Sequence, residues 1–166
     1  MADKKYPFKL KQRVVYPTQG VGVINSIEEK DFNGETVPYF VVYIEVTDMT
    51  IMVPVSKVED LGIRAIVPAE DAQKALDFIG EPFEPNPSDW KLRYQMNLDL
   101  LKKGTVMDIA AIVRSLYHRS KVKELPIMER KLYESAKKLF EDELSYALKK
   151  NKDEIETIIH TRLENR

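Results

Sequence analysis

The chain has 166 residues, and its 26 lysines and arginines nearly balance its 27 aspartates and glutamates. An apolar fraction of 43% is typical of a folded protein, and the lack of cysteine excludes disulfides, thiolate nucleophiles and cysteine-ligated metals. The sequence shows neither a signal peptide nor an apolar run of roughly 18 residues, the length of a membrane helix, so we expect a cytoplasmic protein without a membrane partner.

The first 67 residues predict a small antiparallel barrel or curled sheet. Apolar residues alternate with small or polar ones, and the longest run is rich in β-branched and aromatic residues. Asn33-Gly34 is a strong hairpin signal between two runs. Pro54 cannot donate a backbone hydrogen bond, so the last strand should be an edge strand or bulged. Strands are expected at 13–16, 21–27, 37–46 and 49–55.

From residue 68 onward the pattern predicts four or five amphipathic helices. Pro68 begins the first helix and Gly80 ends it, and a proline-rich connector follows at 81–87. Ser88 is a suitable N-cap for the next helix. We therefore predict an α+β protein in which residues 1–67 form the β domain and residues 68–166 a compact helical bundle. Further cap signals are Gly104, Thr105 with Asp108, Pro126, and Asn151 with Glu154.

Residues typical of catalysis or metal binding are sparse. The chain has no P-loop, no Gly-x-Ser-x-Gly elbow and no His-Glu-x-x-His motif, and His118 and His160 fall on separate predicted helices. Gly20-Val21-Gly22 lies in strand-like sequence without the helix that completes a phosphate-binding loop, which favours turn or bulge geometry. We therefore predict no enzymatic activity, no metal, no cofactor and no small-molecule substrate.

Positive charge is concentrated in one part of the chain. Residues 88–138 carry 12 basic and 6 acidic side chains, whereas residues 68–87 carry 1 and 5. Such a block fits a surface that contacts the phosphate backbone of nucleic acid. It fits a solvated helical surface equally well, and the composition does not separate the two.

Trp90, the only tryptophan, falls in the first turn of a predicted helix, between Asp89 and Lys91. An exposed tryptophan there can contact or stack on a base step. It can also fold under the connector onto Phe83 or Tyr94, and composition alone favours this buried position, because large aromatic side chains are mostly buried. The argument for exposure is that the other apolar residues of this helix supply an apolar face without it: Leu92, Met96, Leu98, Leu100 and Leu101.

Five segments resemble the CarD/CdnL family of bacterial RNA-polymerase-binding transcription regulators. They are VVYPTQGVGVI at 14–24, IMVPVSKVEDLGIR at 51–64, SDWKLRY at 88–94, VMDIAAIVRSLY at 106–117 and ERKLYESAKKLFEDELS at 129–145. Their common order over nearly the whole chain makes the set far more specific than any one segment. The resemblance implies a Tudor-like N-terminal domain that binds the polymerase β subunit, and a helical C-terminal domain that contacts promoter DNA at the upstream edge of the transcription bubble.

The resemblance also implies site residues. Trp90 matches the family tryptophan that wedges into the minor groove, and we expect its indole to be substantially exposed beside the basic surface. The family often has basic residues where Leu92 and Gln95 stand, so the DNA contacts here should be fewer or shift to Lys91. The implied residues are Trp90, Lys91 and Arg93 for DNA, and Val42, Met52 and Pro54 for the polymerase β subunit.

The expected function is regulation of transcription. Docking on polymerase would locate the protein, and the tethered helical domain then needs only weak, largely sequence-independent DNA contacts to stabilise the open promoter complex. An alternative is a polymerase- or peptide-binding adaptor whose helical half binds protein rather than DNA. A free-standing, sequence-specific repressor is a further alternative, which the modest basic block disfavours.

Overall fold

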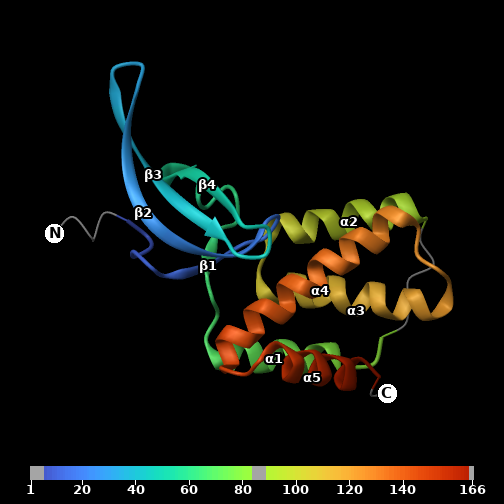
Figure 1. Cartoon of the computed structure of the whole chain (residues 1–166). Coiled ribbons are helices and arrows are strands. Elements are labelled where there is room, and N and C mark those ends of the chain that lie inside the picture. Colours follow the sequence, from blue (N-terminus) through green and yellow to red (C-terminus); the bar gives the residue numbers. More distant parts are fainter. Residues whose placement is uncertain (1–5, 84–88, 165–166) are drawn as a thin grey trace. The chain divides into compact units, whose positions relative to one another are not determined.

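The computed structural model describes residues 6–83 and 89–164. The chain divides into two compact units, the first ending at Ile66 and the second beginning at Val67. The first is an antiparallel sheet and the second consists of helices (Figure 1). The predicted α+β class is therefore confirmed. No helix in the described ranges is long and apolar enough to cross a membrane.

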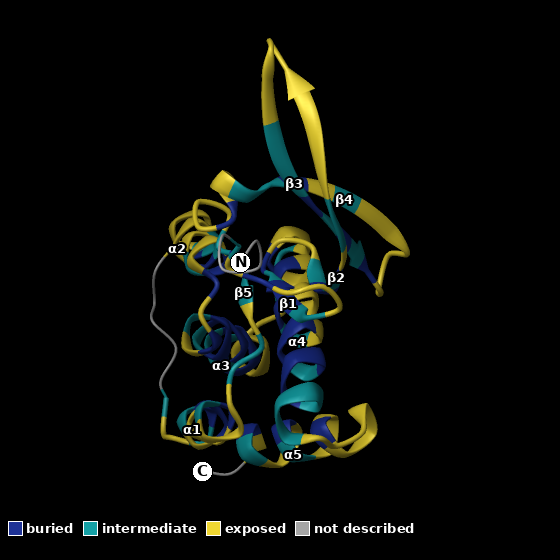
Figure 2. Cartoon of the chain, turned by 90° about the vertical axis from the view of Figure 1, so that its left-hand side faces the viewer, coloured by how far each residue is buried: buried dark blue, intermediate teal, exposed yellow. Residues whose placement is uncertain are grey.

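The sheet has five strands in the order β4-β3-β2-β1-β5. The turn between β2 and β3 is the predicted Asn33-Gly34 hairpin, and both residues have positive φ, 52° and 83°, as a type I′ turn requires. The outer half of this hairpin is exposed on both strands (Figure 2). The strands are β1 (Arg13–Tyr16), β2 (Gly20–Phe32), β3 (Glu35–Ile44), β4 (Met49–Pro54) and β5 (Arg64–Ala65), and a short 3-10 helix, η2 (Val55–Lys57), follows β4.

The core of the first unit comes from one face of the sheet. In β3 alternate residues are buried from Phe40 to Ile44, as the period of two in the sequence predicts, whereas β1 buries both Val14 and Val15. A bulge was predicted at Gly20-Val21-Gly22, but the irregularity of β2 lies between Ile24 and Ser26. The buried cluster contains Phe8, Val14, Ile24, Phe40, Val42, Ile44, Val53, Val58 and Ile63.

Gly22→Ala is expected to destabilise the sheet. Gly22 pairs with Val14 on one side and Ile44 on the other, and an added Cβ would lie 2.8 Å from Cγ1 of Val42 and 2.9 Å from the Tyr43 carbonyl oxygen. Because both neighbouring strands hold the backbone in place, we expect a loss of about 1–3 kcal/mol in the free energy of unfolding, measured in urea. Gly34→Asn is the control, since position 34 has open space and a positive φ that asparagine tolerates. Equal stability of both variants would contradict this packing.

The second unit contains five helices, and several predicted ends are confirmed. Gly104 ends a helix in the left-handed conformation, at φ 73°. Thr105 and Asp108 form a reciprocal capping box, and the amide of Glu154 donates to Asn151 Oδ1 at 2.8 Å. Ser88 and residues 84–87 of the connector lie outside the described residues. The helices are α1 (Ala69–Ile79), α2 (Trp90–Lys103), α3 (Val106–Val122), α4 (Ile127–Leu148) and α5 (Lys152–Glu164).

Candidate functional site

The first candidate surface is the outer face of β3 and β4. β4 is an edge strand, as Pro54 predicted. The register places Met52 opposite Val41 and Pro54 opposite Tyr39. Directly opposed residues project to the same face of a sheet, and Met52 is 37% exposed. These four residues form one surface, which we call the β4 edge patch.

Val42 does not lie in this patch, contrary to the prediction. It pairs with Ile51 and is 1% exposed within the core, because successive side chains of a strand point to opposite faces. The sequence missed Val41 and Tyr39 for the same reason. The run 37–46 is apolar on both faces, so the sequence does not reveal which of the two sets of alternate residues faces the core.

The second candidate surface surrounds the start of α2. Trp90 is the first residue of this helix and is half-buried, whereas Lys91 is exposed. The prediction of a substantially exposed indole is therefore wrong in degree. Asp89 occupies the N-cap position, and its side chain makes no capping hydrogen bond.

The buried face of α2 is partly polar, which overturns the predicted apolar face. Leu92 and Met96 are 57% and 53% exposed, whereas Arg93, Asn97 and Leu101 are buried. These three follow one another at intervals of four and form a single stripe along the helix. Trp90 lies three residues before Arg93, at the border of this stripe, which explains why its indole is half-buried.

Arg93, which was predicted to contact DNA, is buried in an ion pair. Its Nε donates to Glu129 Oε2 at 2.7 Å, and its Nη2 donates to Glu129 Oε1 at 2.6 Å. The side chains of Arg93 and Glu129 are 8% and 0% exposed. Two parallel hydrogen bonds of this kind fix the relative orientation of the guanidinium and carboxylate planes as well as the distance between them.

The basic block divides into paired and unpaired cations. Of its 12 basic residues, six lie within ion-pair distance of a carboxylate, for example Arg130 and Glu124 at 3.1 Å. The other six lie beyond ion-pair distance of any carboxylate that the structure describes: Lys91, Lys102, Lys103, Arg119, Lys123 and Lys131. Lys91, Lys123 and Lys131 belong to the end of the unit where α2 begins, α3 ends and α4 begins, at the right of Figure 1.

The first residues of the connector pack on α3. Phe83 stacks on the buried His118 with ring centroids 5.7 Å apart, and the Arg114 guanidinium lies 4.8 Å from the Phe83 ring. Burial lowers the pKa of Arg114, which Glu81 partly offsets. The start of the connector is therefore anchored on α3.

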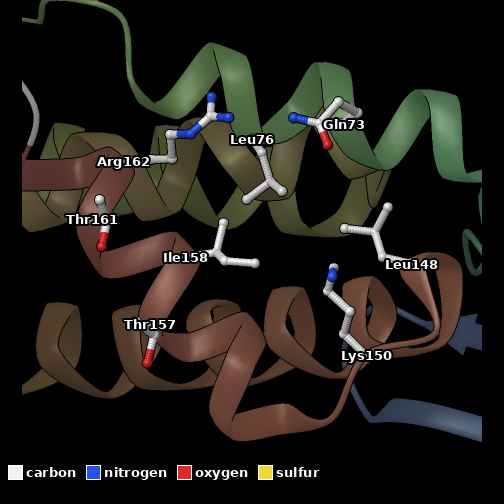
Figure 3. Close-up of a pocket in the computed structure, with 8 residues that line it drawn as sticks. All are labelled: Gln73, Leu76, Leu148, Lys150, Thr157, Ile158, Thr161 and Arg162. Atoms are coloured by element: carbon white, nitrogen blue, oxygen red, sulfur yellow. The ribbon is translucent and has the colours of Figure 1, made fainter.

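A pocket of about 370 Å³ lies between α1 and α5. Its floor is apolar, and the Arg162 guanidinium reaches from α5 towards α1 (Figure 3), where it donates to Asp77 at 2.7 Å and lowers the pKa of that carboxyl group. None of the residues predicted to contact DNA or polymerase lines it. The lining residues are Gln73, Leu76, Leu148, Lys150, Thr157, Ile158, Thr161 and Arg162.

Both units match known protein families. Residues 8–67 match the CarD-like/TRCF RID domain, and residues 74–160 match the C-terminal domain of CarD. The chain belongs to the CarD/CdnL family. A CarD-family relative from Bacillus subtilis (strain 168), named "Putative transcription factor YdeB", is 36% identical over 141 residues, which are 82% of this chain and 90% of the relative. As a member of this family, the protein is a regulator of transcription. The matched families are of transcription-factor type rather than enzymatic.

Proposed function

We propose that the protein docks on the RNA polymerase β subunit through the β4 edge patch and stabilises the open promoter complex by wedging Trp90 into the minor groove. The observation that carries the proposal is the position of Trp90. It begins α2 at the border between buried and exposed surface, beside the unpaired cation of Lys91. Family membership supports the polymerase as the partner.

The β4 edge patch suits docking by strand addition. An edge strand leaves one row of backbone groups without a partner in the sheet, and another chain can pair with them. Met52 and Pro54 add apolar contact beside that row. Docking of this kind depends on the partner's backbone for affinity and on the exposed side chains for specificity.

A tethered wedge needs little affinity of its own. Once the first unit is docked, the helical unit is held at a high effective concentration near the DNA. Inserting an indole at the already unpaired edge of the bubble avoids much of the few kcal/mol needed to unstack a base step. The open complex is therefore stabilised relative to the closed one, with little reading of sequence.

A pull-down of polymerase by the intact, full-length protein is the first experiment, because the binding of every variant is interpreted relative to it. If the protein does not retain the polymerase β subunit, the docking half of the proposal is wrong.

Lys91→Glu is expected to shorten the lifetime of the open promoter complex, with the largest effect at low salt. Contacts to phosphates weaken as salt rises, because binding releases counterions. Lys102→Glu is the matched control, since Lys102 is also exposed and forms no ion pair with a described carboxylate, but lies 11 residues, or about 16 Å, along the same helix. Both variants should bind the β subunit as the parent does. Equal lifetimes for both, at all salt concentrations, would mean that the basic surface near Trp90 is only solvated.

The adaptor alternative is favoured by one observation. Leu92 and Met96, one turn apart on α2, are more than half exposed and form an apolar strip that suits a protein partner. An adaptor predicts that Trp90→Ala weakens binding to polymerase in the absence of DNA and that rising salt has little effect. The wedge predicts the opposite in both measurements.

A further inference from the structure

We propose that the Arg93–Glu129 ion pair positions Trp90, so that Arg93 acts on DNA through the tryptophan and not by direct contact. The proposal rests on the function proposed for Trp90. It assigns a role to a buried pair that joins the first turn of α2 to the first turn of α4.

Arg93 attaches the first turn of α2 to the rest of the helical unit. Of residues 90–93, only Arg93 is buried, whereas Trp90 is half-buried. The N-cap residue, Asp89, gives no side-chain hydrogen bond, although caps ordinarily satisfy the free backbone amides of a first turn. The backbone amide of Arg93 donates to the Asp89 carbonyl at 3.0 Å and closes the turn. The position of this turn therefore depends on the side chain of Arg93.

Glu129 provides a fixed point of attachment for the side chain of Arg93. It is fully buried near the start of the 22-residue α4, which buries Leu132, Ala136 and Phe140 along the following turns. Two parallel hydrogen bonds from one guanidinium restrict rotation as well as translation. Arg93 and Trp90 are three residues apart on one helix, so a rotation prevented at position 93 is also prevented at position 90.

The charge of Glu129 distinguishes a positioning role of Arg93 from a direct DNA contact by Arg93. Glu129 neutralises Arg93, and burial shields the pair from salt. A DNA-contacting arginine would bind phosphate better without a competing carboxylate. A positioning arginine would lose its bidentate anchor, and its buried charge would no longer be neutralised by Glu129. Removing the charge of Glu129 thus has opposite effects under the two interpretations.

The test compares Glu129→Gln with Glu124→Gln in the full-length protein. Both make the same chemical change, but Glu124 pairs with Arg130 at an exposed site, where it is 87% exposed. Trp90 is the only tryptophan, so fluorescence reports its environment without background. We expect Glu129→Gln to lower the fluorescence anisotropy of the indole and to shift its emission to longer wavelengths. We also expect it to shorten the lifetime of the open complex. On a logarithmic scale, this shortening should be at least half of that caused by Trp90→Ala. Glu124→Gln should change none of the three.

Thermal melting of each variant shows whether the helical unit is folded at the assay temperature. If Glu129→Gln is not folded there, Arg93→Lys takes its place, because lysine keeps the charge but cannot form the bidentate bond. A folded variant with unchanged indole emission and anisotropy would overturn the proposal. A longer-lived open complex in Glu129→Gln would instead make Arg93 a direct DNA contact. If Trp90→Ala itself has no effect on lifetime, the wedge is wrong, while the fluorescence still decides whether the pair positions Trp90.

Discussion

Trp90→Ala is expected to shorten the lifetime of the open promoter complex while leaving the binding of polymerase intact. The truncation removes the side chain that would fill the edge of the bubble, but it does not touch the β4 edge patch. The indole is only half-buried, so the loss in free energy of unfolding should fall below the roughly 3–5 kcal/mol of a fully buried aromatic. The lifetime is measured by challenging preformed complexes with a competitor, and stability by the thermal midpoint.

Trp90→Phe is the matched control for this variant, because it keeps an aromatic ring at the same position and should retain part of the lifetime. A large fall in thermal midpoint with an unchanged lifetime would show that Trp90 is a core residue of the helical unit. In that case the wedge would have to be abandoned, and the exposed Leu92 and Met96 would make a protein partner the better explanation.

Met52→Ala combined with Pro54→Ala is expected to weaken binding to the polymerase β subunit strongly, with little change in folding. Both residues lie on the outer face of the edge strand, and their cross-strand neighbours are Val41 and Tyr39. Truncating them removes apolar contact at the proposed interface but leaves the core residues of the sheet in place. Binding is measured with the intact polymerase, and folding by urea unfolding.

Leu61→Ala provides the control for this double variant. Leu61 is 38% exposed, close to the 37% of Met52, and belongs to the same unit but lies outside the patch. It should bind the β subunit as the parent does. If the double variant binds as tightly as Leu61→Ala, the assigned face of the sheet is wrong. Val42→Ala would not serve as a test, because truncating a core residue lowers stability and binding together.

The features that the sequence predicted well are those set by neighbouring residues. The Asn33-Gly34 turn needs two successive residues with positive φ, and the Thr105 and Asp108 cap needs side chains three positions apart. Both conditions lie within a few residues of the chain. Pro54 likewise predicted the edge strand, because a residue without a backbone N–H cannot complete the hydrogen bonding of an interior strand in any sheet.

The features that the sequence did not predict depend on distant partners. The apolar residues of α2 suggested a face that the helix does not bury, because Arg93 finds its partner 36 positions away at Glu129. A buried arginine is favourable only when such a partner exists, and the local pattern carries no sign of it. The two-residue β5 is too short to show any period, and it forms only because β1 offers a free edge.

The division of the chain at Ile66 and Val67 has a consequence for synthesis. Every strand pairing joins residues between 13 and 65, so the last partner of the sheet, β5, emerges from the ribosome before the first helix does. The sheet can therefore form while the helices are still being translated, since domains fold as units and N-terminal ones fold first. A nascent chain would thus acquire its edge strand, and with it the surface proposed for polymerase, before the part that carries Trp90 has emerged and folded.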